Sequence, residues 1–298
     1  MSLTLNCTLL CASGASYDIN PLTGIYTPDA VFSPAVAYTV PPTAISGDQI
    51  NACLVGQTSI GIVVAFRGTI PPGDPDSFPD WLQDFFAEPV SAPGLPGLVH
   101  SGFMDALNSL IAGVINAVKA LKPGPQNPVY VTGHSKGGGI APLAAYLLQQ
   151  TYGIPVRQTI TFAAPKSGNL GFVTGYQLIF KNHLRYENYG DLVPLLPPAD
   201  SFIAGLAQAL SYIPDIGQEL AKIVSEAAGW DYLEVGQELY IESNGNININ
   251  EPDWEQIIDF VWNLASNILD AVGALANAHA LGCGHGYMNG TCQKSVCG

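Results

Sequence analysis

A glycine turn between a β-rich run and a helical pattern constrains this chain more than any other feature. Residues 129–132 read Val-Tyr-Val-Thr, and an apolar helical pattern starts at Ile140. Between them, Gly133-x-Ser135-x-Gly137 places a glycine two positions either side of a serine. A strained strand–turn–helix connection needs such glycines, and it holds the serine hydroxyl at the helix N-terminus. The pattern predicts a nucleophile elbow, and an ordinary glycine-rich βα loop is the alternative.

Alternating strand and helix patterns predict an α/β fold with a mostly parallel sheet and helices on both faces. The apolar run at 60–66 is typical of a strand buried on both faces, and 159–165, 184–189 and 236–241 also read as strands. Helical periodicity covers 104–121. The helical segments 201–230 and 254–278 are additions that either cap a pocket or buttress the sheet. Without internal repeats or a low-complexity linker, residues 1–298 are expected to form a single domain.

Composition narrows the functional classes. The chain carries 24 acidic and 10 basic residues, a net charge of −14, which argues against nucleic acid as a partner. Only 11% of residues are charged, and 32 Gly and 23 Pro indicate a loop-rich, extracellular type of enzyme. Residues 1–12 do not resemble a signal peptide. We expect no apolar run long enough to cross a membrane, and therefore no stable membrane insertion.

Six cysteines gather mainly near the two ends of the chain. Their spacings match no zinc pattern, so no metal is expected. An even number near the termini predicts disulfides that fix the chain ends, with buried free thiols as the alternative. The sequence alone leaves the pairing open.

A serine nucleophile needs a base and an acid, which follow the serine in the order acid, then histidine, in α/β-hydrolases. Asp191 fits the acid because it follows a strand in a tight loop after Gly190; Asp200 and Asp215 have weaker contexts. His279 continues the apolar stripe of the preceding helix, which favours a packed, structural histidine. His285 lies in a glycine-rich loop beyond that helix, so His285 is the predicted base.

The other histidines are given supporting roles. His134 is expected to pack beside the elbow, His100 to support the fold near the site, and His183 to lie at the surface. The oxyanion hole should combine the backbone N–H of Lys136, the residue after the serine, with that of Thr69, after the strand at 60–66. We hypothesise that the Lys136 ammonium pairs with a nearby carboxylate.

A proline-rich loop followed by a short amphipathic element occupies residues 70–88. Its Trp81-Leu82-Gln83-Asp84-Phe85-Phe86 run is flanked by prolines on both sides. Such a segment could be a movable flap over a site or a surface connection whose aromatics pack down.

Six motifs in order resemble the class 3 lipases, the fungal lipase-like branch of the α/β-hydrolases. They are Phe66-Arg67-Gly68-Thr69, Trp81-x-x-Asp84, His100-x-Gly102-Phe103, Thr132-Gly133-His134-Ser135-x-Gly137-Gly138, Thr161-Phe162-x-x-Pro165-x-x-Gly168-Asn169 and Asp191-Leu192-Val193-Pro194-x-Leu196-Pro197. The resemblance covers 60–200, and His285-x-Tyr287 with Gly290-Thr291-Cys292 is similar to the end of the fungal enzymes.

The resemblance implies a Ser135, Asp191 and His285 triad, an oxyanion hole of Thr69 and Lys136, and a lid at 70–88. It also implies a bond from Cys292 to Cys7 or Cys11. Lys136 departs from the leucine usual after the serine. Asp191 and His285 are 94 positions apart (285 − 191 = 94), a long separation for the family.

The function implied is a serine carboxylic-ester hydrolase without a cofactor. Triacylglycerol lipase is favoured over phospholipase A1, feruloyl esterase and polyester hydrolase. A non-catalytic lipid-binding protein on the same fold is the alternative from another class. The expected partner is an ester or lipid substrate, and the oligomeric state is not predicted.

Overall fold

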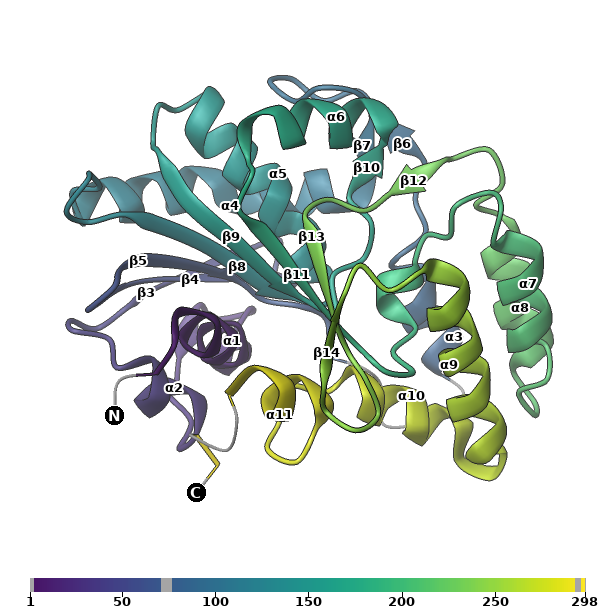
Figure 1. Cartoon of the computed structure of the whole chain (residues 1–298). Coiled ribbons are helices and arrows are strands. Elements are labelled where there is room, and N and C mark those ends of the chain that lie inside the picture. Colours follow the sequence, from purple (N-terminus) through teal and green to yellow (C-terminus); the bar gives the residue numbers. More distant parts are fainter. Residues whose placement is uncertain (1–2, 71–76, 293–295, 298) are drawn as a thin grey trace.

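An eight-stranded sheet forms the centre of the computed structural model, which describes residues 3–70, 77–292 and 296–297 (Figure 1). Its strand order is β14-β13-β11-β9-β8-β5-β4-β3, and the five strands from β13 to β5 are parallel. The bounds are β3 Thr43–Gly47, β4 Asn51–Thr58, β5 Gly61–Phe66, β8 Val129–His134, β9 Val156–Phe162, β11 His183–Asn188, β13 Gln237–Ile241 and β14 Ile247–Ile249. The predicted α/β fold is confirmed.

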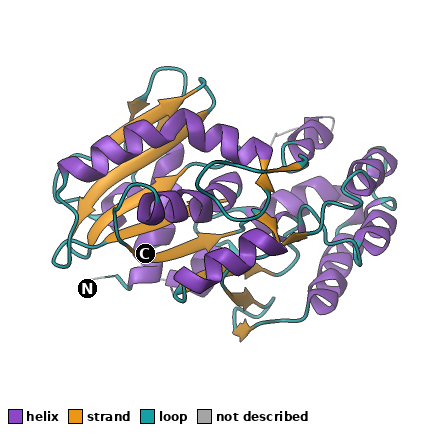
Figure 2. Ribbon diagram, turned by 90° about the horizontal axis from the view of Figure 1, so that it is seen from above, coloured by secondary structure: helices purple, strands orange, loops and turns teal. Residues whose placement is uncertain are grey.

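Helices cover both faces of the sheet (Figures 1 and 2). The helices α4 (Ser101–Ala120) and α5 (Lys136–Gln150) pack on one face, and α1 (Leu5–Ala15) with α11 (Gly286–Cys292) packs on the other. Every residue of β5 is buried. Ile62 and Val64 belong to the apolar cluster on the α4 and α5 face of the sheet, and Val63 and Ala65 belong to the cluster on the α1 and α11 face. This two-sided burial explains why the strand is almost continuously apolar.

Short elements complete the fold. A second sheet has the order β12-β10-β7-β6, with β6 Pro89–Val90, β7 Val99–His100, β10 Gly168–Asn169 and β12 Tyr232–Leu233. A hairpin joins β1 (Ile19–Asn20) to β2 (Ile25–Tyr26). The remaining helices near the sheet are α2 Phe32–Val36, α3 Phe78–Gln83 and α6 Leu170–Ile179. Of the predicted lid at 70–88, residues 71–76 lie outside the described part of the chain.

Four helices lie at the C-terminal side of the parallel strands: α7 Ile203–Leu210, α8 Gly217–Ser225, α9 Asp253–Ser266 and α10 Ala271–His279. Segment 201–230 thus contains two helices, as expected, and α8 packs against α3. The single long helix expected over 254–278 is wrong. The chain breaks at Asn267 and forms a short 3-10 turn at Ile268–Asp270 before α10 starts.

The expectation that no apolar run is long enough to cross a membrane is wrong for one helix. With 20 residues and a mean hydropathy of 1.2, α4 is long and apolar enough to cross a membrane. However, its side chains Leu107, Leu110 and Val114 are fully packed in the core between α4 and the sheet. The apolar stripe is explained by burial against the sheet.

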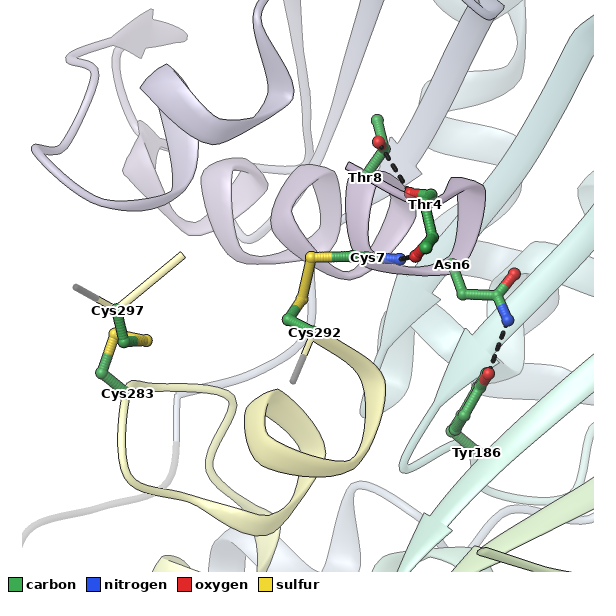
Figure 3. The surroundings of a disulfide bond; sticks show 8 residues. All are labelled: Thr4, Asn6, Cys7, Thr8, Tyr186, Cys283, Cys292 and Cys297. Carbon is green, nitrogen blue, oxygen red and sulfur yellow. Dashed lines mark hydrogen bonds between the residues drawn. A yellow bond between two sulfur atoms is a disulfide. The ribbon is translucent and has the colours of Figure 1, made fainter. Parts of the chain in front are cut away.

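Two disulfides fix the chain ends (Figure 3). Cys7 on α1 is bonded to Cys292 at the end of α11, and Cys283 is bonded to Cys297. Cys11 and Cys53 are buried free thiols. The predicted terminal disulfides are therefore confirmed, including the bond from Cys292 to the N-terminal helix.

Candidate active site

The glycine turn has the geometry of a nucleophile elbow. Ser135 stands between β8 and α5 with φ 57° and ψ −135°, a left-handed conformation that L-residues rarely adopt. A Cβ atom at Gly133 would collide with the Gly137 carbonyl, and one at Gly137 would collide with the Phe66 carbonyl on β5. The two glycines are therefore required by the close approach of strand and helix, as the sequence predicted.

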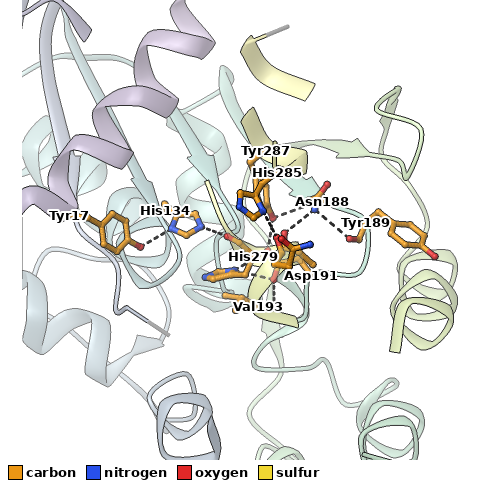
Figure 4. Close-up of polar contacts among 11 residues, drawn as sticks. Tyr17, His134, Asn188, Tyr189, Asp191, Val193, His279, His285 and Tyr287 are labelled. Carbon is orange, nitrogen blue, oxygen red and sulfur yellow. Dashed lines mark hydrogen bonds and ion pairs between the residues drawn. The ribbon is translucent and has the colours of Figure 1, made fainter. Parts of the chain in front are cut away.

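Asp191 lies in the turn after β11 and is paired with a histidine. The His279 Nδ1 atom lies 3.0 Å from Asp191 Oδ2 and 3.1 Å from Oδ1 (Figure 4). Both side chains are buried, with Asp191 5% and His279 2% exposed. The carboxylate can only accept, so Nδ1 carries the proton and the opposite ring atom, Nε2, is left as a base.

Two further donors hold the Asp191 carboxylate. The Tyr287 hydroxyl donates to Oδ2 over 2.7 Å, and the Val193 backbone N–H donates to Oδ1 over 3.0 Å. The turn itself depends on Gly190, whose φ of 73° is left-handed. Three donors fix the carboxylate's orientation.

The histidine that the structure places at Asp191 is not the predicted base. His285 Nδ1 contacts the Asn277 carbonyl at 3.2 Å on an exposed part of the chain, and the histidine that contacts Asp191 is His279. The prediction assumed that a histidine on an apolar stripe is structural. His279 is indeed buried, but it is the last residue of α10, and that helix end delivers its ring to Asp191.

The two atoms between which a proton would move are both buried and unpaired. Ser135 Oγ and His279 Nε2 have no hydrogen-bond partner among the described residues. Buried polar atoms are nearly always paired, and unpaired ones gather at functional sites. A hydroxyl and a neutral imidazole nitrogen form the donor and acceptor of a general-base pair.

His134 supports the backbone of His279. The His134 Nε2 atom lies 2.8 Å from the His279 carbonyl, and its Nδ1 atom lies 2.7 Å from the Tyr17 hydroxyl (Figure 4). The carbonyl can only accept, so Nε2–H donates to it and Nδ1 accepts from Tyr17. Burial, followed by the charge of His279, holds the pKa of His134 well below its usual value. The prediction that His134 packs beside the elbow is confirmed.

His100 connects α4 to the segment that follows α3. It caps α4, where its Nδ1 accepts from the Phe103 N–H, and its Nε2–H donates to the Phe85 carbonyl over 3.1 Å. Burial lowers its pKa to about 4. Its predicted supporting role is confirmed. The predicted surface position of His183 is wrong: it is buried, with Nε2 3.1 Å from Thr161 Oγ1.

An aromatic ring of α3 packs against His279, and a second ring just after α3 packs on the first. The Trp81 ring lies 5.7 Å from the His279 ring in an edge-on arrangement, and Phe85 lies 5.0 Å from Trp81. The Ser135 side chain is fully buried. Trp81 therefore shields one side of the His279 ring.

Lys136 begins α5, so its backbone N–H is one of the helix donors without an intrahelical acceptor. Burial lowers the pKa of its ammonium, and Asp84 opposes that shift. Burial also raises the pKa of the Asp84 carboxyl, and Lys136 opposes that shift. The ion pairs within 4.0 Å among the described residues do not include Lys136, so its pairing with Asp84 stays a hypothesis.

An apolar cavity of about 310 Å³ borders His279. Tyr17, Phe32, Ile70 and Leu281 supply most of its apolar wall. Hydrocarbon fits such a wall better than a polar group does. The cavity is therefore suited to an apolar part of a substrate.

Sequence reasoning missed two contributors to this site. Tyr287 carries a signal, because it lies in the His285-x-Tyr287 motif, but its hydroxyl was given no role. Trp81 also lies in a recognised motif, yet its position over His279 depends on the long-range packing of α3.

Comparison with known proteins agrees with this geometry. Residues 63–201 match the model of the family Lipase (class 3). The chain is 33% identical over 152 residues to a lipase of Rhizomucor miehei and 31% identical over 224 residues to a lipase of Caenorhabditis elegans. These alignments cover 48% and 71% of this chain but only 39% and 58% of the two relatives.

A solved structure shares the fold over most of its length. It is that of a triacylglycerol lipase whose catalytic centre is a serine-protease-type triad. It is 25% identical to this chain, with a TM-score of 0.57 and 82% of each chain covered. The resemblance found in the sequence is thereby confirmed: residues 63–201 match the class 3 lipase family, and the fold is shared with a solved lipase.

Proposed function

We propose that this protein is a serine carboxylic-ester hydrolase that acts on acylglycerols through Ser135, His279 and Asp191. The observation that carries the proposal is a buried Asp191–His279 pair whose His279 ring lies 4.6 Å from the ring of His134, the residue before the strained Ser135. Ser135 Oγ and His279 Nε2 have no partner among the described residues. An oriented acid (Asp191), a neutral base (His279) and a strained serine hydroxyl (Ser135) are the groups that nucleophilic catalysis requires.

Each step of the reaction uses one of these groups. His279 Nε2 takes the proton of Ser135 Oγ as this oxygen attacks the ester carbonyl carbon. The imidazolium then donates the proton to the leaving alcohol, and a water activated by His279 releases the acid from the acyl-enzyme. Asp191 keeps Nδ1 protonated and stabilises the imidazolium. The backbone N–H groups of Thr69 and Lys136 hold the developing oxyanion, and losing one such donor typically costs about 3 kcal/mol.

The segment around α3 acts as a lid in this proposal. Ser135 is fully buried and Trp81 of α3 lies against the His279 ring, so in this proposal an ester reaches the hydroxyl only after α3 moves. The closed position also leaves the Trp81 indole N–H buried without a partner among the described residues. An unpaired buried donor costs about 1–3 kcal/mol, which opening the lid would recover.

The outer face of α9 suits the surface of a lipid droplet. Trp254, Ile258, Val261 and Trp262 lie on one side of the helix and are 56%, 46%, 39% and 64% exposed. Tryptophan favours lipid–water interfaces, and an apolar helix face binds them by burying its side chains. The helix has no Lys or Arg, so an uncharged lipid surface fits it better than an anionic one.

Secretion is part of the proposal. Curated relatives include a secreted mono- and diacylglycerol lipase of Fusarium solani, 33% identical over 141 residues. Two disulfides in this chain support an oxidising compartment.

Two experiments test the proposal. The wild type should hydrolyse emulsified acylglycerols and react with a fluorophosphonate probe, and Ser135→Ala should lose both activities. Labelling that persists in Ser135→Ala would exclude this serine as the nucleophile. Phospholipid and p-nitrophenyl esters of several chain lengths, assayed in parallel, then separate acylglycerol lipase from phospholipase A1 and simple esterase.

A double variant tests the exposed apolar face of α9, which we call the docking face. Trp254→Ser with Trp262→Ser should lower activity on emulsified tributyrin about tenfold or more and leave activity on a soluble ester unchanged. Two tryptophans that become buried in the lipid surface contribute several kcal/mol to binding that surface. Leu178→Ser is the matched control, since Leu178 is 72% exposed on α6. An equal loss in the control, or no loss in the double variant, would contradict the docking face.

A further inference from the structure

A large cavity with a partly polar wall lies next to the chain segments that precede Asp191 and His279. Its volume is about 710 Å³, within the range of about 300–1,000 Å³ typical of small-molecule sites. Six of its sixteen lining residues have amide side chains: Asn188, Asn244, Asn263, Asn267, Asn277 and Asn289. They come from β11, from the β13–β14 turn and from α9, α10 and α11.

The chemistry of this wall selects an uncharged, hydroxyl-rich ligand. Each amide side chain offers both donors and an acceptor, which matches hydroxyl groups that donate and accept at once. Glu242 is its one carboxylate, and the residues that line the cavity include no Lys or Arg. Phosphate and sulfate find no Lys or Arg here and only one histidine, His285, and a single carboxylate is too few for a hard cation. A sugar ring satisfies these constraints.

A sugar acceptor sequence lies at the rim of the same cavity. Asn289-Gly290-Thr291 is one of two Asn-x-Thr sequences in the chain, the pattern to which N-linked glycans are attached. Asn289 is exposed on α11 and lines the cavity. The second acceptor sequence, Asn6-Cys7-Thr8, differs: the Asn6 amide donates to the Tyr186 hydroxyl over 2.6 Å, and Cys7 is in a disulfide.

We propose that Asn289 carries an N-linked glycan whose first N-acetylglucosamine lies in the amide-lined cavity. Attachment uses a lipid-diphosphate-linked oligosaccharide as the donor. A bond forms between Asn289 Nδ2 and C1 of the sugar, the C1–oxygen bond to the diphosphate breaks, and the amide proton leaves with the diphosphate. The Thr291 hydroxyl is buried and has no hydrogen-bond partner among the described residues, so attachment precedes the folding of α11.

The position links the glycan to the catalytic pair without involving it in the reaction. The cavity wall includes Asn277 and Ala278, which precede His279, and Asn188 and Tyr189, which precede Asp191. The Asn188 amide already donates to the Ala278 carbonyl over 2.9 Å, so these two segments are joined at this point. A sugar ring bound there contacts both segments and stabilises their arrangement. Removal of the glycan should therefore lower the melting temperature of the protein by about 2 °C or more.

The test uses the full chain secreted from a eukaryotic host with an added secretion signal, so it does not depend on the native location or on ester hydrolysis. Mass spectrometry of peptides should find a glycan on Asn289 and none on Asn6 in the folded, secreted protein. Pro21→Asn provides the matched control, because it creates an acceptor sequence, Asn-Leu22-Thr23, in the exposed turn before β2. An unmodified Asn289 in a chain that carries the control glycan would overturn the site.

A second measurement tests the cavity. An amidase that cleaves the bond between Asn289 and the first sugar should act on the native protein at least tenfold more slowly than on the control glycan, and equally fast after denaturation. Asn267→Trp fills the cavity from α9 and should restore native cleavage while the glycan stays attached. Equal native cleavage at Asn289 and at the control site in the wild type would overturn the buried position of the sugar.

Discussion

The assignment of the base to His279 gives the sharpest test of the site. We consider His279→Ala beside His285→Ala. The first removes the only histidine ring whose nitrogen contacts Asp191 among the described residues. The second removes a half-exposed ring whose Nδ1 contacts the Asn277 carbonyl at 3.2 Å. The two histidines are six positions apart, yet they differ completely in their surroundings.

The magnitudes follow from those contacts. Without His279, no group takes the Ser135 proton, and loss of a triad histidine typically lowers kcat by about 10⁴–10⁶, or about 5–8 kcal/mol in the barrier. Asp191 loses one of its donors but keeps Tyr287 and Val193, so the free energy of unfolding should fall by only about 1.5–3 kcal/mol. For His285→Ala, the lost exposed contact is worth about 0.5 kcal/mol in stability and nothing in kcat.

The assay is ester hydrolysis under saturating substrate, with fluorophosphonate labelling of Ser135 as a second readout that does not need turnover. Circular dichroism and urea unfolding show whether each variant is folded. Folded His279→Ala should be inactive and label slowly, and His285→Ala should match the wild type. Retention of more than about 1% activity by His279→Ala, or an inactive but folded His285→Ala, would refute the assignment.

Three further predictions concern the groups around the site. Tyr287→Phe removes the 2.7 Å hydrogen bond to Asp191, so kcat should fall about tenfold and stability by about 1.5–3 kcal/mol; unchanged kinetics would show that the bond does not orient the acid. Burial and the neighbouring Glu187 raise the pKa of Glu238 to about 9. Between pH 4.5 and 9 the folded chain therefore binds more protons than the unfolded chain, and stability should fall with rising pH by up to about 1.4 kcal/mol per unit. Glu238→Gln should flatten that slope in urea unfolding, and an unchanged slope would contradict the buried, protonated carboxyl. A double-mutant cycle of Lys136→Leu and Asp84→Asn should give a coupling energy of about 0.5–1 kcal/mol, and a coupling of zero would reject the pair.

The sequence was sufficient to predict those parts of the site whose positions depend on nearby backbone geometry. The elbow could be predicted because Gly133 and Gly137 are imposed by contacts within one strand–turn–helix unit. Asp191 could be predicted because it follows a strand and a turn glycine, and the parallel sheet brings strand ends together at one edge. The same reasoning predicts the position of Thr69, after β5.

The pairing of His279 with Asp191 could not be predicted because the position of His279 depends on a break in a helix. The apolar stripe over 254–278 fits one continuous helix, in which His279 points into a core. The chain instead turns at Asn267, and α10 then approaches β11 in a new direction. Periodicity correctly predicts that His279 is buried, but burial is also what a catalytic base requires when its partner is a buried carboxylate. Periodicity therefore cannot separate a structural histidine from a catalytic one.

The C-terminal helix α11 joins chain stability to the catalytic acid. Tyr287 at its start donates to Asp191, and Cys292 at its end is bonded to Cys7 on α1, 285 positions earlier. The helix has only seven residues, too few to be stable by itself, so its position depends on these two attachments and on its packing against α1 and β11. The disulfide therefore does more than close the chain ends. By holding α11 on the sheet, it keeps the Tyr287 hydroxyl at the carboxylate that orients His279.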